Sequence, residues 1–259
     1  MQTIQWKCSG ASVRGSSHEA NDMECQDAWA MHVAQDALAI CVCDGAGSVA
    51  HSRAGAEITA GIVTQWLAER FEEAVTEPLD FFLIVHSEIL SALRKTADGL
   101  ACEIGDLSCT LVAVAVDSTG RYIYWHLGDG GIIARIGNEV KVLSIPKKGE
   151  HANETFFVTD NNAAEHLQFR VSTEEKQNVT GFAVFSDGLE RLLYCHTTLA
   201  VAPAVAGMLD WHKQADEDTV SKALENNLTD VFRTKTNDDC SLVLLTANYR
   251  GNDGHAGGN

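Results

Sequence analysis

The sequence predicts an α+β fold, a four-layer α-β-β-α sandwich of two mainly antiparallel sheets flanked by helix pairs. Three observations support this prediction. Short apolar runs are separated by turn signals such as the DSTG at residues 117–120 and the GN at residues 137–138, which favour hairpins. Longer segments repeat apolar residues with the spacing of one helix face. These helical segments come in pairs after separate groups of strands, so each pair is expected to cover its own sheet.

The elements are expected in the following order. A strand-like run at residues 37–43 (ALAICVC) comes first, and helical patterns follow it at residues 52–72 and 79–97. In the first helical pattern, Ile58, Ile62 and Trp66 lie on one apolar stripe. Two late helical patterns are expected at about residues 197–213 and 218–233. The other strand-like runs lie at residues 109–116, 121–127, 131–136, 139–143, 181–185 and 241–246.

The chain length and the punctuation of the sequence indicate one domain. A chain of 259 residues fits a single large domain, and its 3 prolines leave no long Pro/Gly/Ser linker between two halves. We therefore expect a single catalytic domain at residues 1–249. The polar, glycine-rich residues 250–259 are expected to be a disordered tail. Residues 144–180, which include KKGEHANETFF, are expected to form a variable flap or connector that selects substrates.

The charge and cysteine content exclude several classes of partner. The formal net charge of −17 argues against nucleic acid, whose phosphates require clustered Lys and Arg. The segment MQTIQWKCSG lacks the pattern of a signal peptide, and the 8 cysteines contain no C-x-x-C pair, so disulfides and zinc are not expected. No apolar stretch approaches the length of a membrane span. A cytoplasmic protein without membrane contact is the resulting expectation.

Four aspartates at the ends of apolar runs are the main candidates for chemistry. They are Asp44 in CVCDGAGS, Asp129 in HLGDGG, Asp187 in VFSDGLE and Asp238 in NDDCSLVLL. Strand ends of one sheet can bring such residues together, where two charges 4 Å apart repel by roughly 4 kcal/mol at an effective dielectric near 20. Protons or hard cations must offset this repulsion, and oxygen ligands favour Mg²⁺ or Mn²⁺. A metal-dependent hydrolase of phosphate esters is the function that this pattern predicts.

The order of the motifs resembles the type 2C family of metal-dependent Ser/Thr protein phosphatases, and in particular its compact bacterial members. The motifs are CQDA at residues 25–28, CDGAGS at 43–48, LSCTLV at 107–112, LGDG at 127–130, SDGL at 186–189 and DDCS at 238–241. One Asp-Gly pair would be a weak signal, because such pairs commonly form turns or helix caps. Six motifs in the order of the family are a specific one. The resemblance implies phosphorylated protein substrates and a cognate kinase.

The resemblance also implies a catalytic centre with two Mg²⁺ or Mn²⁺ ions and a third, weaker one. Asp44 would bridge two metals, and the Gly45 carbonyl would bind one of them. Asp187 and Asp238 would hold the other. A bridging hydroxide would then attack phosphorus. Asp129 is implied as a ligand of the weaker metal. Asp27 is implied to support metal-bound water.

Several positions depart from the family pattern. No arginine stands near Asp22, where the family has its phosphate-binding arginine, so Arg14 or His18 is expected to contact phosphate. His18 also fits a simple polar loop residue. Ala46 stands where some eukaryotic members have a proton-donating histidine, so leaving-group protonation is expected from solvent. Asp239 is expected to be a solvated neighbour of the metal ligands.

Three rival functions remain open from the sequence. CSGASVR at residues 8–14 fits the C-x₅-R loop of cysteine-dependent phosphatases, although roughly 0.3 such matches are expected by chance in this composition. The fold could instead serve as a phosphopeptide-binding or regulatory module with weak turnover. A nucleotide site in the DGAGS loop lacks both common phosphate-binding signatures.

Overall fold

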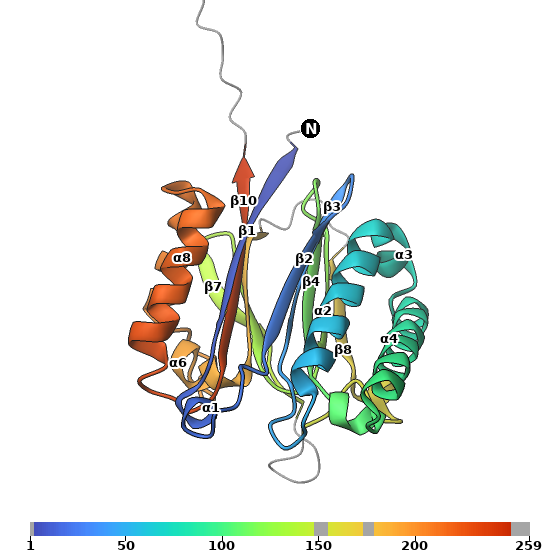
Figure 1. The fold of residues 1–259 in the computed structure, drawn as a ribbon. Helices are drawn as coiled ribbons and strands as arrows, with labels where there is room; N and C mark the ends of the chain where they lie inside the picture. The colour runs from blue at the N-terminus through green and yellow to red at the C-terminus, as the bar shows by residue number, and fades with distance from the viewer. Residues whose placement is uncertain (1–2, 148–154, 173–178, 250–259) are drawn as a thin grey trace, which may run out of the picture.

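The computed structural model describes residues 3–147, 155–172 and 179–249, and they form the predicted four-layer sandwich (Figure 1). Two five-stranded sheets lie face to face, with strand orders β1-β10-β9-β6-β7 and β2-β3-β4-β5-β8. Every paired strand is antiparallel to its neighbour. The strands are β1 (Ile4–Val13), β2 (Ala28–Val33), β3 (Ala37–Cys43), β4 (Leu111–Asp117), β5 (Tyr122–Leu127), β6 (Gly131–Ile136), β7 (Glu139–Ser144), β8 (Gln168–Ser172), β9 (Val179–Phe185) and β10 (Cys240–Tyr249).

Helices cover the outer face of each sheet (Figure 1). The long α2 and α4 cover the β2-β3-β4-β5-β8 sheet together with α3, and α8 covers the other sheet beside shorter helical segments. The helices are α1 (Ser16–Ala20), α2 (Ser52–Glu69), α3 (Phe71–Thr76), α4 (Pro78–Leu100), α5 (Ala163–His166), α6 (Glu190–Leu193), α7 (Pro203–Met208) and α8 (Glu217–Asn227). The 3₁₀ segments are Ile104–Leu107, Asp187–Leu189 and Trp211–Lys213, and η4 is a π-helical turn at Leu228–Phe232. None of the helices in the described ranges is both long and apolar enough to cross a lipid bilayer.

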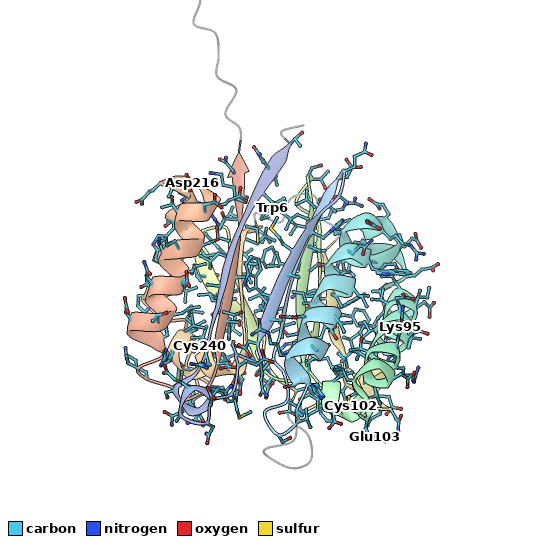
Figure 2. All side chains as sticks on the ribbon, in the orientation of Figure 1. Trp6, Lys95, Cys102, Glu103, Asp216 and Cys240 are labelled. Carbon is cyan, nitrogen blue, oxygen red and sulfur yellow. The ribbon has the colours of Figure 1, made fainter. Side chains whose placement is uncertain are left out.

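Side-chain alternation along the central strands builds three apolar layers (Figure 2). On β3, Leu38, Ile40 and Val42 face the opposite sheet, whereas Ala39 and Cys41 face α2 and α4. Small side chains on the helix side allow the helices to approach the sheet closely, and branched side chains fill the space between the sheets. Both faces are therefore buried, which explains why this strand reads as a continuous apolar run.

The late helical prediction at residues 197–213 is wrong as one helix. Leu199 adopts a positive φ of 56°, and α7 begins only at Pro203, whose missing N–H suits the first helical position. The helix that was predicted at residues 52–72 ends at Glu69, because Arg70 leaves helical geometry before α3 begins. The predicted tail at residues 250–259 lies outside the described residues, as do residues 148–154 and 173–178 of the expected flap.

Candidate metal centre

The sheet topology brings the acidic loops to one end of the sandwich. The start of β6 lies beside the end of β9, because Gly131 pairs with Phe185. Phe185 pairs in turn with Leu242, close to the start of β10. The end of β3 and the loop before β6 approach the same cavity of about 190 Å³. The aspartates that line this cavity are Asp44, Asp129, Asp187 and Asp238.

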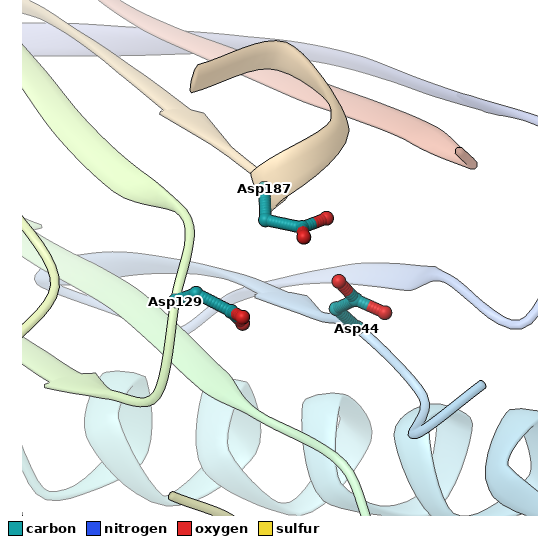
Figure 3. Close-up of side chains that lie close together, drawn as sticks. All are labelled: Asp44, Asp129 and Asp187. Carbon is teal, nitrogen blue, oxygen red and sulfur yellow. The ribbon is translucent and has the colours of Figure 1, made fainter. Parts of the chain in front are cut away.

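Asp44, Asp129 and Asp187 form the tightest acidic group in the described part of the chain. One carboxylate oxygen of each lies within 4.8 Å of the others, and the three side chains point toward one another (Figure 3). Burial, reinforced by repulsion from neighbouring carboxylates, raises the pKa of Asp187 to about 6 and that of Asp44 well above its usual range. Burial also raises the pKa of Asp129. The group is thus a destabilising concentration of negative charge without a cation.

Asp238 lines the same cavity from the turn before β10, but it lies outside this group of three. Its side chain is exposed, and its Oδ1 accepts a hydrogen bond of 3.0 Å from the backbone N–H of Asp239. Repulsion from Asp238 contributes to the raised pKa of both Asp187 and Asp129. The structure therefore places Asp238 next to the group, with a carboxylate that is available from the solvent side.

Asp27 lies behind these aspartates and is buried. The Ser186 hydroxyl donates a hydrogen bond of 2.7 Å to Asp27 Oδ2, and it accepts one of 3.0 Å from the backbone N–H of Ser241. Asp27 Oδ1 is buried and has no hydrogen-bond partner among the described residues. Burial raises the pKa of Asp27 to about 8, with repulsion from Asp239 and Asp187 adding to it. The role of Asp27 in holding metal-bound water stays a prediction, and its unpartnered oxygen is consistent with that role.

The backbone around Asp44 is fixed by β4. The Asp44 N–H donates to Thr110 Oγ1 at 3.0 Å, and the Thr110 N–H donates to the Asp44 carbonyl at 2.8 Å. The next residue, Gly45, pairs with Cys109 and lines the cavity. A Cβ at Gly45 would lie 2.8 Å from the backbone oxygen of Gln26, so a larger residue would displace this loop. This close packing explains why glycine follows Asp44 at position 45.

Asp239 corrects an expectation from the sequence, because it is buried at 2% exposure and is not a solvated neighbour. It accepts hydrogen bonds of 2.6 Å from the backbone N–H groups of Gly15 and Gln26, and one of 2.9 Å from His18 Nδ1. Both aspartates precede β10, and Asp238 lines the cavity while Asp239 is buried. Asp239 therefore joins three separate segments beneath the cavity.

The structure separates the two candidates for phosphate contact. His18 lines the cavity, and its imidazole is fixed by Asp239. Arg14 is not among the lining residues: its guanidinium donates to the Met23 carbonyl at 3.1 Å and lies 3.9 Å from Glu19. Of the two candidates, only His18 lines the cavity, and its contact with phosphate stays a prediction.

Two residues of the cavity carried no signal in the sequence. Thr155 Oγ1 donates to Asp129 Oδ2 at 2.8 Å, and both Thr155 and Phe157 line the cavity. They belong to the stretch 144–180 that was expected to select substrates, and an isolated threonine there belongs to no motif. Only tertiary structure places it against Asp129.

The C-x₅-R interpretation is wrong. Cys8 lies inside β1, which extends to Val13, so the residues between Cys8 and Arg14 are a strand and not a phosphate-binding loop. Burial raises the pKa of the Cys8 thiol to about 12, which keeps it from forming a nucleophilic thiolate near neutral pH.

Known proteins resemble this chain in sequence and in fold. The chain is 31% identical over 196 residues to serine/threonine-protein phosphatase 3 of Escherichia coli (strain K12), an alignment that covers 73% of this chain and 76% of that protein. The serine/threonine phosphatase of S. agalactiae superposes with a TM-score of 0.64 at 17% identity, with 93% and 99% of the two chains covered. The catalytic domain of the phosphatase PstP, in complex with 2 manganese ions, superposes with a TM-score of 0.57 at 13% identity, covering 95% and 99%.

The family model of protein phosphatase 2C matches residues 14–229, which include five of the six motifs. The sixth, DDCS at residues 238–241, lies beyond the matched region, where β10 begins. The expected fold and the expected family are therefore both confirmed. This chain belongs to the protein phosphatase 2C family.

Proposed function

We propose that the protein hydrolyses phosphoserine and phosphothreonine monoesters in proteins, with Mg²⁺ or Mn²⁺ as cofactor. The observation that carries the proposal is the convergence of Asp44, Asp129 and Asp187, whose carboxylate oxygens lie within 4.8 Å of one another. The substrate class is supported by the relative from Escherichia coli, which is named a serine/threonine-protein phosphatase. A protein kinase must form such a substrate, and a cytoplasmic location remains a prediction.

The residues of the cavity fit hard divalent cations. The donors are all carboxylate or carbonyl oxygens, which suits Mg²⁺ and Mn²⁺ better than softer metals. Asp129 Oδ1 and Asp187 Oδ1 are buried and have no hydrogen-bond partner within the described ranges. An unpartnered buried carboxylate oxygen is costly unless a cation binds it. The solved PstP domain with 2 manganese ions has the same fold, which supports a centre of this kind.

In this proposal, each aspartate has a separate role. Asp44 and the Gly45 carbonyl would hold one cation, and Asp44 would share a second with Asp187 and Asp238. Asp129 and Asp187 would hold a third. When bound, the cations supply positive charge for the phosphoryl oxygens and an activated water that attacks phosphorus.

The protein side chains orient the substrate around this centre. Asp239 accepts a hydrogen bond from His18 Nδ1, which fixes the ring, and Nε2 would donate to a phosphoryl oxygen when the ring carries a proton on both nitrogens. Ser186 holds Asp27 Oδ2 and thereby orients Asp27 Oδ1. Ala46 cannot donate a proton, so the departing serine or threonine oxygen would be protonated by solvent.

A regulatory module that binds phosphopeptides without turnover is the second candidate. One observation favours it: no arginine or lysine lines this cavity among the described residues, so His18 is the one basic side chain in the described lining. The retained aspartates favour the enzyme, because a module has no need for a repulsive acidic cluster.

Phosphate release from p-nitrophenyl phosphate and from phosphopeptides tests the proposal. The wild type with Mn²⁺ should release phosphate, and both EDTA and the variants Asp44→Asn and Asp187→Asn should lower kcat/KM by at least about 100-fold. Asp98→Asn, on the exposed face of α4, is the matched control and should keep its activity. Activity that survives EDTA would contradict the proposal. Tight phosphopeptide binding without turnover in Mn²⁺ would favour the regulatory module.

A further inference from the structure

A second hollow lies beside the catalytic cavity, between α1 and the segment that joins η4 to β10. We call it the flank groove. It has a volume of about 560 Å³ and is open to solvent. The residues that line it are Ser16, Thr229, Arg233, Thr234, Lys235, Thr236 and Asn237.

The flank groove and the catalytic cavity share their walls. Ser16 lines the groove, and His18, two residues further along α1, lines the cavity. In the same way, Asn237 lines the groove and the adjacent Asp238 lines the cavity.

Two hydrogen bonds hold the walls together: Ser16 Oγ donates to Asn237 Oδ1 at 3.1 Å, and the Ser17 N–H donates to the Asn237 carbonyl at 2.9 Å. Both walls lie at the end of the sandwich where β10 begins, which Figure 2 marks with Cys240. A substrate bound in the cavity therefore has the groove as its neighbour.

The groove is basic in a chain whose formal net charge is −17. Arg233 is paired with Glu19, which also lies near Arg14, so these arginines help to anchor α1. Lys235 is exposed and makes no ion pair with any described residue. The lysine therefore has no structural partner on this surface, and its charge is available to a ligand.

Uncharged donors complete the groove. Thr236 Oγ1 accepts a hydrogen bond of 3.2 Å from the Asp238 N–H, so its own hydrogen remains free for another acceptor. Asn237 uses its side-chain oxygen for Ser16, which leaves its amide N–H₂ group to donate. A positive charge beside such donors suits an oxyanion, that is, a carboxylate or a phosphate.

We propose that the flank groove binds an anionic side chain of the substrate, located close in sequence to the phosphoserine or phosphothreonine in the catalytic cavity. The proposal rests on the proposed phosphatase function and adds a preference to it. Lys235 supplies the charge, and Thr236 and Asn237 supply the directional hydrogen bonds. Because the groove is open, its contribution falls as salt rises. An exposed ion pair of this kind changes affinity by about two- to fivefold.

Three phosphoserine peptides test the flank groove: one with alanine flanks, one with glutamate flanks and one with a second phosphoserine. The wild type should hydrolyse at least one of the anionic peptides with kcat/KM about two- to fivefold higher than the alanine peptide, through KM. The peptide that is preferred identifies carboxylate or phosphate as the ligand. Lys235→Gln should abolish the preference and Lys235→Glu should reverse it. Lys95→Gln, on the distant α4 (Figure 2), is the control and should behave as wild type.

Hydrolysis of p-nitrophenyl phosphate, which has no flank, separates the two proposals. The rate of p-nitrophenyl phosphate hydrolysis should be the same in Lys235→Gln as in the wild type. If the wild type does not hydrolyse this compound, the phosphatase proposal fails, but the flank groove is not yet tested. Peptide affinity measured by fluorescence anisotropy on Asp44→Asn then still reports on the groove. The proposal for the flank groove would be overturned if the wild type had equal kcat/KM and equal affinity for all three peptides. It would also be overturned if Lys235→Gln kept the preference for an anionic peptide.

Discussion

Asp187→Asn should stabilise the metal-free protein at neutral pH, although it should destroy the metal centre. Burial and the charges of Asp129 and Asp238 raise the pKa of Asp187 from 3.8 to about 6. Between these values the folded state holds a proton that the unfolded state has released, so wild-type stability falls as pH rises through this window. Each pKa unit corresponds to about 1.4 kcal/mol, and the loss between about pH 4.5 and pH 7.5 is about 2 kcal/mol.

The asparagine variant lacks this titration. In EDTA, the stability of Asp187→Asn relative to wild type should therefore increase by about 2 kcal/mol over the same pH range, or about 4–8 °C in Tm for a domain of this size. The measurement is the difference between the two melting curves. The difference is needed because burial also lowers the pKa of His126 to about 4. This shift makes the stability of the folded protein rise with pH, which is opposite to the effect of Asp187. That contribution is common to both proteins and cancels.

Manganese should reverse the order of the two proteins. The cations bind the ionised carboxylates of the wild type and compensate the repulsion, so Mn²⁺ should raise the wild-type Tm more at about pH 7.5 than at about pH 5. The variant has one ligand fewer and should gain much less. A difference between the proteins that is flat with pH in EDTA would refute the reasoning. So would an equal response of both proteins to Mn²⁺.

Further substitutions test the surroundings of the centre. Asp239→Asn should lower the free energy of unfolding, measured with denaturant, by about 1–3 kcal/mol. The buried carboxylate accepts hydrogen bonds from three N–H groups, and the amide that replaces it has one acceptor oxygen. Gly15→Ala should weaken Mn²⁺ binding in a calorimetric titration, since its Cβ would lie 2.3 Å from the Asp238 carbonyl carbon; Gly99→Ala, with nothing within 4 Å, should bind as wild type. Cys8→Ser should keep its metal-dependent phosphatase activity, and a loss of turnover with unchanged melting would reopen thiol chemistry.

The sequence predicts the centre of the fold better than its edges. The runs at residues 37–43 and 131–136 match β3 and β6 to the residue, because both strands are interior to their sheets and buried over most of their length. Strands β1, β2 and β8 were not predicted. Each is an edge strand in which polar residues interrupt the apolar pattern. The fourth edge strand, β7, was predicted, because Val140 and Val142 alternate with exposed residues.

The candidate site shows the same limit. Asp44, Asp129 and Asp187 follow from motifs at strand ends, and the structure brings them together. The burial of Asp239 and the contact from Thr155 to Asp129 depend on segments that are distant in sequence. Local patterns contain no information on such contacts, because the partner segments are separated in sequence and meet only in the folded structure. Motif order locates the cavity, and tertiary structure assigns its supporting residues.

Direct titration of manganese into the metal-free protein, with free Mn²⁺ followed by electron paramagnetic resonance, tests the central claim most directly. If Asp44, Asp129, Asp187 and Asp238 form the proposed centre for several cations, the wild type should take up at least about two Mn²⁺ per chain in the millimolar range. Asp44→Asn should bind at least about tenfold more weakly, and the surface variant Asp98→Asn should bind as wild type. A wild type that takes up no Mn²⁺ at millimolar concentration, or an Asp44→Asn variant with unchanged affinity, would contradict the account.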